Sequence, residues 1–113
     1  GPEVEPRPAE AVARAFLLAG TAQERFPEEP VSFVAEALIA QQAGDLERAL
    51  DAWGEALALD EVSVRARASR ARIFVRLGRL DEARREIAAA EQIASSPLLR
   101  TARAELERAD AGG

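Results

Sequence analysis

The feature that most constrains the fold is a segment that occurs twice in the chain, 34 residues apart. Residues 44–60 read GDLERALDAWGEALALD, and residues 78–94 read GRLDEARREIAAAEQIA. The recurring residues are Gly44 and Gly78, Leu46 and Leu80, Ala49 and Ala83, and Ala56 and Ala90. A fixed period of this length is typical of arrays of paired helices, in which each unit buries its apolar face against the next.

The first copy has the pattern of an amphipathic helix. Its apolar residues fall at helical spacing and form one stripe: Leu46, Ala49, Leu50, Trp53, Ala56 and Leu57. Gly44 is suited to end the preceding helix, and Asp45 is suited to cap the new one. The segment therefore predicts a helical hairpin with its turn at Gly44.

Caps and helix breakers predict six helices in all. Pro27 and Pro30 stop the first helix, Ser32 and Ser63 are candidate N-caps, and Ser96 precedes a proline at the start of the last helix. The expected helices cover residues 9–26, 31 or 32 to 43, 46–60, 64–77, 80–94 and 97–110. No strand is expected, because β-branched residues are sparse and never alternate over a useful length.

The chain is short enough for one domain, flanked by two short terminal segments. Residues 1–8 are expected to be a tag scar, Gly1-Pro2, followed by a proline-rich linker. That linker is either disordered or a tether to a preceding domain. Residues 9–110 form the predicted helical domain, and residues 111–113 are expected to be a frayed tail.

The composition lacks most side chains that enzymes use as nucleophiles or bases. There is no histidine, cysteine, lysine or tyrosine, and the glycines form no phosphate-binding cluster. We therefore expect no enzymatic activity, no cofactor and no metal site.

Charge and hydropathy limit the classes of partner. The net charge of −5 argues against nucleic acid as a partner, although five arginines in residues 65–76 keep it as a distant alternative. The apolar runs are shorter than a membrane span, so no membrane partner is expected. The first residues show no signal pattern, which leaves the compartment open with the cytoplasm slightly favoured.

The helix pairs resemble tetratricopeptide repeats, because the small and aromatic slots of that motif can be placed in both copies. In the first copy these slots hold Phe33, Ala37, Ala49, Trp53 and Ala56. In the second copy they hold Ala71, Phe74, Ala83, Ile87 and Ala90. The first helix keeps the register of an earlier second helix through Ala15, Ala19, Ala22 and Pro27. The resemblance covers residues 9–110 and implies an all-α solenoid of six antiparallel helices: a half repeat, two full repeats and a capping helix.

Two charged residues depart from the repeat pattern. The leucine slot holds Glu36 in the first full repeat and Arg70 in the second. Since their charges are opposite, one hypothesis is that they form an ion pair between the first helices of the two repeats. The alternative is that each charge is solvated separately.

The resemblance also implies a function. In this family the first helices of the pairs line a groove that holds a peptide or a partner helix, usually within a larger scaffold or adaptor protein. The groove residues implied here are Val34, Leu38 and Gln42 in the first repeat, Arg65, Ser69, Arg72 and Arg76 in the second, and Arg103 on the last helix. Such a groove would favour a protein ligand with an apolar anchor and an acidic stretch. The alternative is that these arginines only solvate the helix and pair with nearby glutamates.

A second surface suggests a different role. The first helix has no predicted partner before it, so Leu17 and Leu18 are expected to be exposed. An exposed apolar patch at the open end of a helical array indicates association. Self-association into a homodimer through these leucines is therefore the alternative function.

Overall fold

The computed structural model describes residues 8–112, so the expected linker over residues 1–7 lies outside the described residues. Within that range the chain is all-α and has no strand. The six helices are α1 (Pro8–Arg25), α2 (Pro30–Ala43), α3 (Leu46–Leu59), α4 (Val64–Arg76), α5 (Leu80–Glu91) and α6 (Pro97–Gly112). The predicted number of helices is confirmed for this part of the chain.

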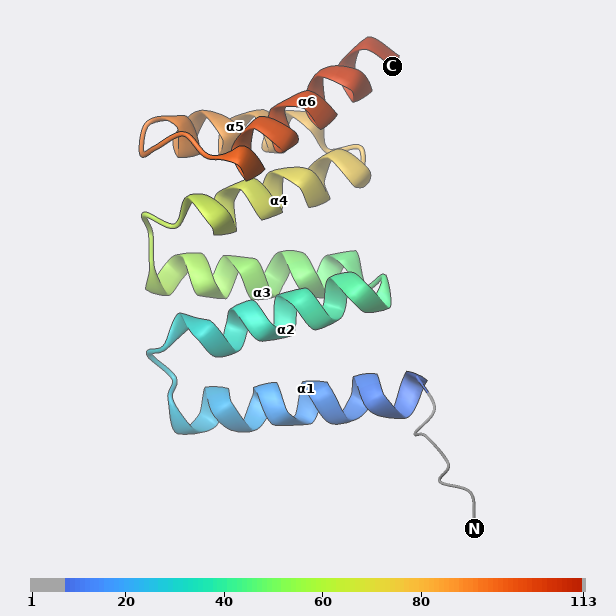
Figure 1. Cartoon of the computed structure of the whole chain (residues 1–113), viewed down its shortest axis with the longest axis vertical. Coiled ribbons are helices and arrows are strands. Elements are labelled where there is room, and N and C mark those ends of the chain that lie inside the picture. Colours follow the sequence, from blue (N-terminus) through green and yellow to red (C-terminus); the bar gives the residue numbers. More distant parts are fainter. Residues whose placement is uncertain (1–7, 113) are drawn as a thin grey trace.

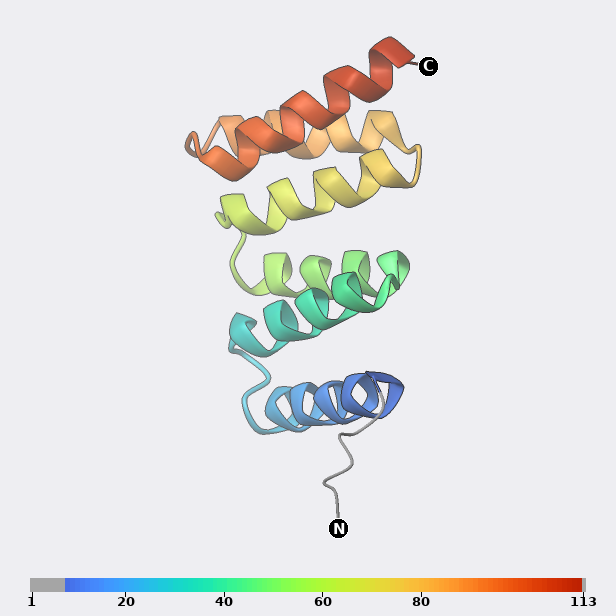
Figure 2. The same cartoon turned by 45° about the vertical axis from the view of Figure 1, so that its right-hand side comes forward.

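The helices are stacked side by side along the longest axis of the molecule (Figure 1). Helix α2 packs between α1 and α3, and α4 packs against α3, α5 and α6. In both views α1 lies at one end of the stack and α6 lies at the other (Figures 1 and 2). This order leaves one side of α1 without a covering helix among the described residues.

The core consists mainly of alanines at equivalent positions of the two helix pairs. Ala49 and Ala83 are completely buried, and so are Ala37 and Ala71. Alanine at these positions lets two helices approach closely, while larger side chains fill the space between them. The largest buried side chain is Trp53, whose indole N–H donates a hydrogen bond of 2.6 Å to the side-chain oxygen of Gln41.

The turns at Gly44 and Gly78 have the same geometry. Their φ angles are 78° and 75°, in the left-handed region that favours glycine. At the first turn, the Gly44 N–H donates to the Gln41 carbonyl, and the Asp45 N–H donates to the Ala40 carbonyl. At the second turn, the N–H groups 34 residues later donate to the carbonyls of Val75 and Phe74. Both turns are therefore Schellman motifs in the same register.

Three of the predicted N-caps are confirmed. The Asp45 carboxylate accepts from the Arg48 N–H at 3.2 Å, and the Ser63 hydroxyl accepts from the Ala66 N–H at 3.1 Å. The Ser96 hydroxyl accepts from the N–H three residues ahead at 3.0 Å. Each bond satisfies one of the free N–H groups in the first turn of its helix.

The cap predicted at Ser32 is wrong. Helix α2 begins two residues earlier, at Pro30, because proline already has the φ angle of a helical first turn. Ser32 is therefore inside the helix, and its hydroxyl donates to the Glu29 carbonyl at 3.4 Å.

The ends of the last two helices also differ from the prediction. Helix α5 ends at Glu91 rather than residue 94, because the N–H groups of Ile93 and Ala94 both turn back to the Ala90 carbonyl. Helix α6 continues to Gly112, so residues 111 and 112 are helical rather than a frayed tail.

Candidate functional site

Helix α2 presents an exposed apolar row. Val31 is 69% exposed and Leu38 is 40% exposed, while Val34 is half-buried. Val31, Leu38 and Gln42 share one face because they are spaced by seven and then four residues along the helix. The predicted residues Leu38 and Gln42 are thus accessible, and Val34 contributes only part of its side chain.

The predicted cationic row on α4 is only partly available. Ser69 is 7% exposed and belongs to the core, so its predicted role as a groove residue is wrong. The Arg72 guanidinium donates to both carboxylate oxygens of Glu105 on α6, with Nε–Oε2 at 3.1 Å and Nη2–Oε1 at 2.9 Å. This two-pronged ion pair joins α4 to α6 and holds Arg72 in place.

Two other arginines of α4 have a different status. Arg65 lies with its guanidinium carbon 5.6 Å from the centre of the Trp53 ring, which is within the range of a cation–π contact. Arg65 and Arg76 are both exposed, and no ion pair is found for either within residues 8–112. These two side chains are the cations of α4 that remain able to meet an acidic ligand.

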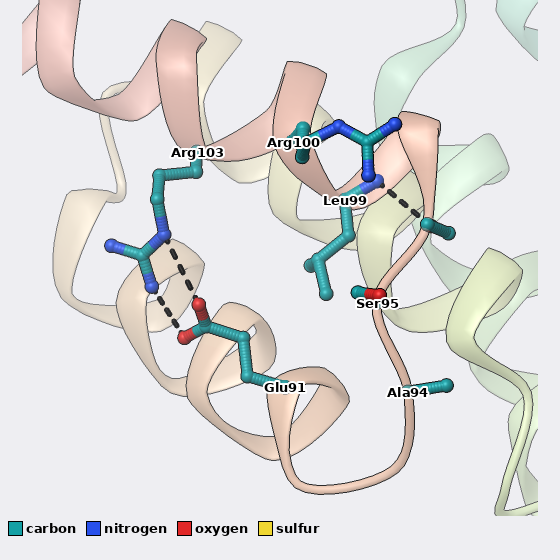
Figure 3. Close-up of a pocket in the computed structure, with 7 residues that line it drawn as sticks. Glu91, Ala94, Ser95, Leu99, Arg100 and Arg103 are labelled. Carbon is teal, nitrogen blue, oxygen red and sulfur yellow. Dashed lines mark hydrogen bonds and ion pairs between the residues drawn. The ribbon is translucent and has the colours of Figure 1, made fainter.

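Arg103 lies beside a pocket of about 270 Å³ at the turn between α5 and α6. Its guanidinium forms two hydrogen bonds with Glu91, one of them at 3.2 Å from Nε to Oε2, and Leu99 lies between this pair and the turn (Figure 3). The sequence singled out Arg103 but not Glu91 or Arg100, the other charged residues that line the pocket. The only sequence signal for this pocket is the Ser-Ser-Pro segment that forms the turn.

The hypothesis of an ion pair between Glu36 and Arg70 is wrong, and so is the alternative that each is solvated alone. Glu36 pairs with Arg48 at 3.0 Å, within the first helix pair. Arg70 pairs with Glu86 at 3.1 Å and donates to the Leu50 carbonyl at 3.0 Å. Each charge has a closer opposite partner on the second helix of its own pair, so the two do not need one another.

A glycine provides the space for Arg70. A Cβ atom added at Gly54 would lie 2.7 Å from Arg70 Nη1, which is closer than real Cβ contacts. Arg67 points to the same carboxylate, with Nη1 at 3.5 Å from Glu86, and its Nε is buried without a hydrogen-bond partner. This partly buried cluster links α4 to α3 and α5, and it is a structural feature rather than an open site.

Two exposed ion pairs shift the ionisation of their members. Arg79 donates two hydrogen bonds to Glu82, at 2.8 and 2.9 Å, and these bonds lower the pKa of Glu82 and raise the pKa of Arg79. The hydrogen bond to Asp110 raises the pKa of Arg84. Both pairs favour the charged forms that already prevail at neutral pH, so neither prepares a catalytic acid or base.

The described residues contain no group of three or more metal-ligating side chains close enough to hold a metal ion. No helix among residues 8–112 is long and apolar enough to cross a membrane. Comparison of the chain with protein-family models, with curated proteins and with solved structures finds no match.

The predicted exposure of Leu17 and Leu18 on α1 is confirmed, at 73% and 66%. These two leucines are among the most exposed large apolar side chains in the described part of the chain. Beside Leu17, a shallow depression of about 560 Å³ is lined by Phe16 and Arg48 among others. The molecule therefore has two separate apolar surfaces, one on α2 and one on α1.

Proposed function

We propose that the chain is a tetratricopeptide-like helical repeat domain, with α1 as a half repeat, α2–α3 and α4–α5 as full repeats, and α6 as the cap. Two features support this assignment. The turns at Gly44 and Gly78 share one hydrogen-bonding pattern, and alanines 34 residues apart are equally buried in the two helix pairs. Repeated turns and repeated close contacts are the physical basis of a stacked array.

The function that we propose is a non-catalytic protein–protein interaction module that binds a peptide or a helix along α2 and α4. The observation that carries this proposal is the exposed apolar row of α2, above all Val31 and Leu38. Helix α2 already packs against α1 and α3, so these side chains are not needed for the core. Contact with an apolar ligand side chain would remove them from water.

The charges of α4 suggest the rest of the ligand. Arg65 and Arg76 are exposed, and their guanidinium groups suit carboxylates. Arg72 contributes less to this proposal than the sequence implied, because Glu105 already neutralises it. The preferred ligand is thus a segment with an apolar anchor for α2 and acidic residues for α4. The absence of histidine, cysteine and lysine from the sequence supports a role without catalysis.

A peptide-display selection on the purified domain tests this proposal. Selected peptides are expected to combine an apolar residue with acidic residues, and to lose at least about tenfold in affinity on Leu38→Glu or Arg76→Glu. Val62→Glu is the control, because Val62 is also exposed but lies in the connection between α3 and α4. Selected peptides that bind Leu38→Glu and Arg76→Glu as tightly as the wild type would refute the proposed site.

Self-association is the second candidate function, and the exposure of Leu17 and Leu18 favours it. The two functions use different helices, so each can be lost without the other. A concentration series in sedimentation separates them, because binding along α2 and α4 needs no dimer.

A further inference from the structure

The outer face of α1 carries six side chains that all point away from the core. Leu17 and Leu18 lie at its middle, and charged or polar residues lie on either side of them. The exposed residues that share this face by helical spacing are Glu10, Arg14, Leu17, Leu18, Thr21 and Arg25. On the opposite side of the helix Ala19 is buried and Phe16 is half-buried, where α1 meets α2 and Arg48 of α3.

The order of these residues is complementary to itself when it is reversed. Glu10 lies seven residues before Leu17, and Arg25 lies seven residues after Leu18. Arg14 and Thr21 lie three residues outside the leucines on the same two sides. Two copies of α1 that run antiparallel, with their leucines opposed, would therefore place each Glu10 beside Arg25 of the other copy.

A parallel arrangement has no such complementarity. It would place Glu10 beside Glu10, Arg14 beside Arg14 and Arg25 beside Arg25, and like charges at these distances repel. The antiparallel arrangement has two opposite-charge contacts, one at each end, and a neutral Thr21 facing each Arg14. A two-fold axis through the middle of the helix generates this arrangement without any other requirement.

We propose that the outer face of α1 is an isologous dimer interface, whose occupant is a second copy of this chain in antiparallel orientation. Because α1 lies at the end of the stack, the second copy extends the stack and leaves the exposed face of α2 free (Figures 1 and 2). A contact made by one helix from each copy is small, so the dimer dissociates on dilution. This proposal deepens the second candidate function and does not depend on the binding surface of α2 and α4.

Sedimentation at a series of protein concentrations tests whether the dimer exists. The wild-type chain is expected to pass from monomer to dimer as its concentration rises. Leu17→Glu is expected to raise the dissociation constant at least about tenfold, because it places two carboxylates in the apolar centre. Val62→Glu is the control for a general effect of added charge, and circular dichroism checks that each variant stays helical. A wild-type chain that stays monomeric, or a dimer that Leu17→Glu leaves intact, overturns the proposal.

Charge reversal tests the orientation. Glu10→Arg alone and Arg25→Glu alone are each expected to weaken the dimer, and the two together are expected to restore it, because the pair is exchanged within the symmetric contact. A dimer that the double variant fails to restore contradicts the antiparallel register.

Cysteine cross-linking gives an independent readout, since the natural chain has no cysteine. Under mild oxidation a mixture of the Glu10→Cys and Arg25→Cys chains is expected to form a cross-linked pair faster than either chain alone. Faster cross-linking of Glu10→Cys with itself would indicate the parallel arrangement and refute the proposal. None of these outcomes bears on peptide binding by α2 and α4, so the two proposals fail separately.

Discussion

Ala49 and Ala83 occupy positions where two helices approach each other so closely that no larger side chain fits without movement. Both are completely buried, as are Ala37 and Ala71 on the first helices of the two pairs. These residues could be identified from the sequence, because burial of small side chains at a fixed period is a local property of each helix. At this scale, the repeat is a set of close contacts.

Replacement of these alanines by leucine is expected to overpack the contact. Ala49→Leu and Ala83→Leu should each lower the free energy of unfolding by about 1–3 kcal/mol. Ala88→Leu is the matched control, because Ala88 is an exposed alanine on the same helix as Ala83. Chemical denaturation measures the change, and equal stability of Ala83→Leu and Ala88→Leu would contradict the assignment.

Gly54 is predicted to be coupled to Arg70. In an Arg70→Met background, Gly54→Ala should stabilise the chain by about 0.5–1 kcal/mol, as expected for alanine over glycine in a helix. In the wild type this gain should be lost, because the new Cβ displaces the guanidinium from the Leu50 carbonyl. A double-mutant cycle by chemical denaturation measures the coupling. The same effect of Gly54→Ala in both backgrounds would refute it.

The pair of Arg79 and Glu82 predicts a pH-dependent contribution to stability. Because Arg79 lowers the pKa of Glu82, the contribution is complete above the ordinary pKa of a glutamate and is lost as the pH falls through the lowered value. Glu82→Gln should therefore reduce stability at neutral pH and have no effect below about pH 3. Thermal unfolding across this pH range measures the difference, and a difference that grows in acid would be contrary to the prediction.

The sequence could not predict which charges pair. Glu36 and Arg70 have opposite signs in equivalent slots, yet each meets a partner on the neighbouring helix of its own pair. A long side chain selects its partner from all the groups that the packed helices bring within reach. That selection depends on the rotation of each helix, which the spacing of residues leaves open.

At the scale of helices and turns, the glycines at the hairpin turns carry the clearest sequence signal. Gly44 and Gly78 both follow the last residues of an apolar helix, and both have a positive φ angle. The prediction of these turns succeeded because a left-handed residue after a helix is a local requirement. The end of α5 was less predictable, because its apolar pattern continues past Glu91 while the Ser-Ser-Pro segment forces a turn.

Gly44→Ala and Gly78→Ala should destabilise the chain by similar amounts, about 1–2 kcal/mol each. The reason is conformational, since no atom would lie within 4 Å of a Cβ at either position apart from its own neighbours. Thermal or chemical denaturation of the two variants measures these costs. If one substitution proved costly and the other neutral, the two turns would not be equivalent.

At the scale of the whole molecule, the number and order of the helices could be predicted, but their exposed surfaces could be predicted only in part. Leu38 and Arg76 are accessible as expected, whereas Ser69 is buried and Arg72 is engaged by Glu105. These differences arise where α4 packs against α6, a contact between helices that the repeat pattern treats as separate units. The two accessible rows that remain define the proposed binding surface on α2 and α4.

The most direct test of that surface is to map the contact of a display-selected peptide by NMR chemical-shift changes in the labelled domain. The proposal predicts that the largest changes lie on the exposed sides of α2 and α4, around Leu38 and Arg76. Changes confined to α1, α3 or α5, with α2 and α4 unaffected, would contradict it.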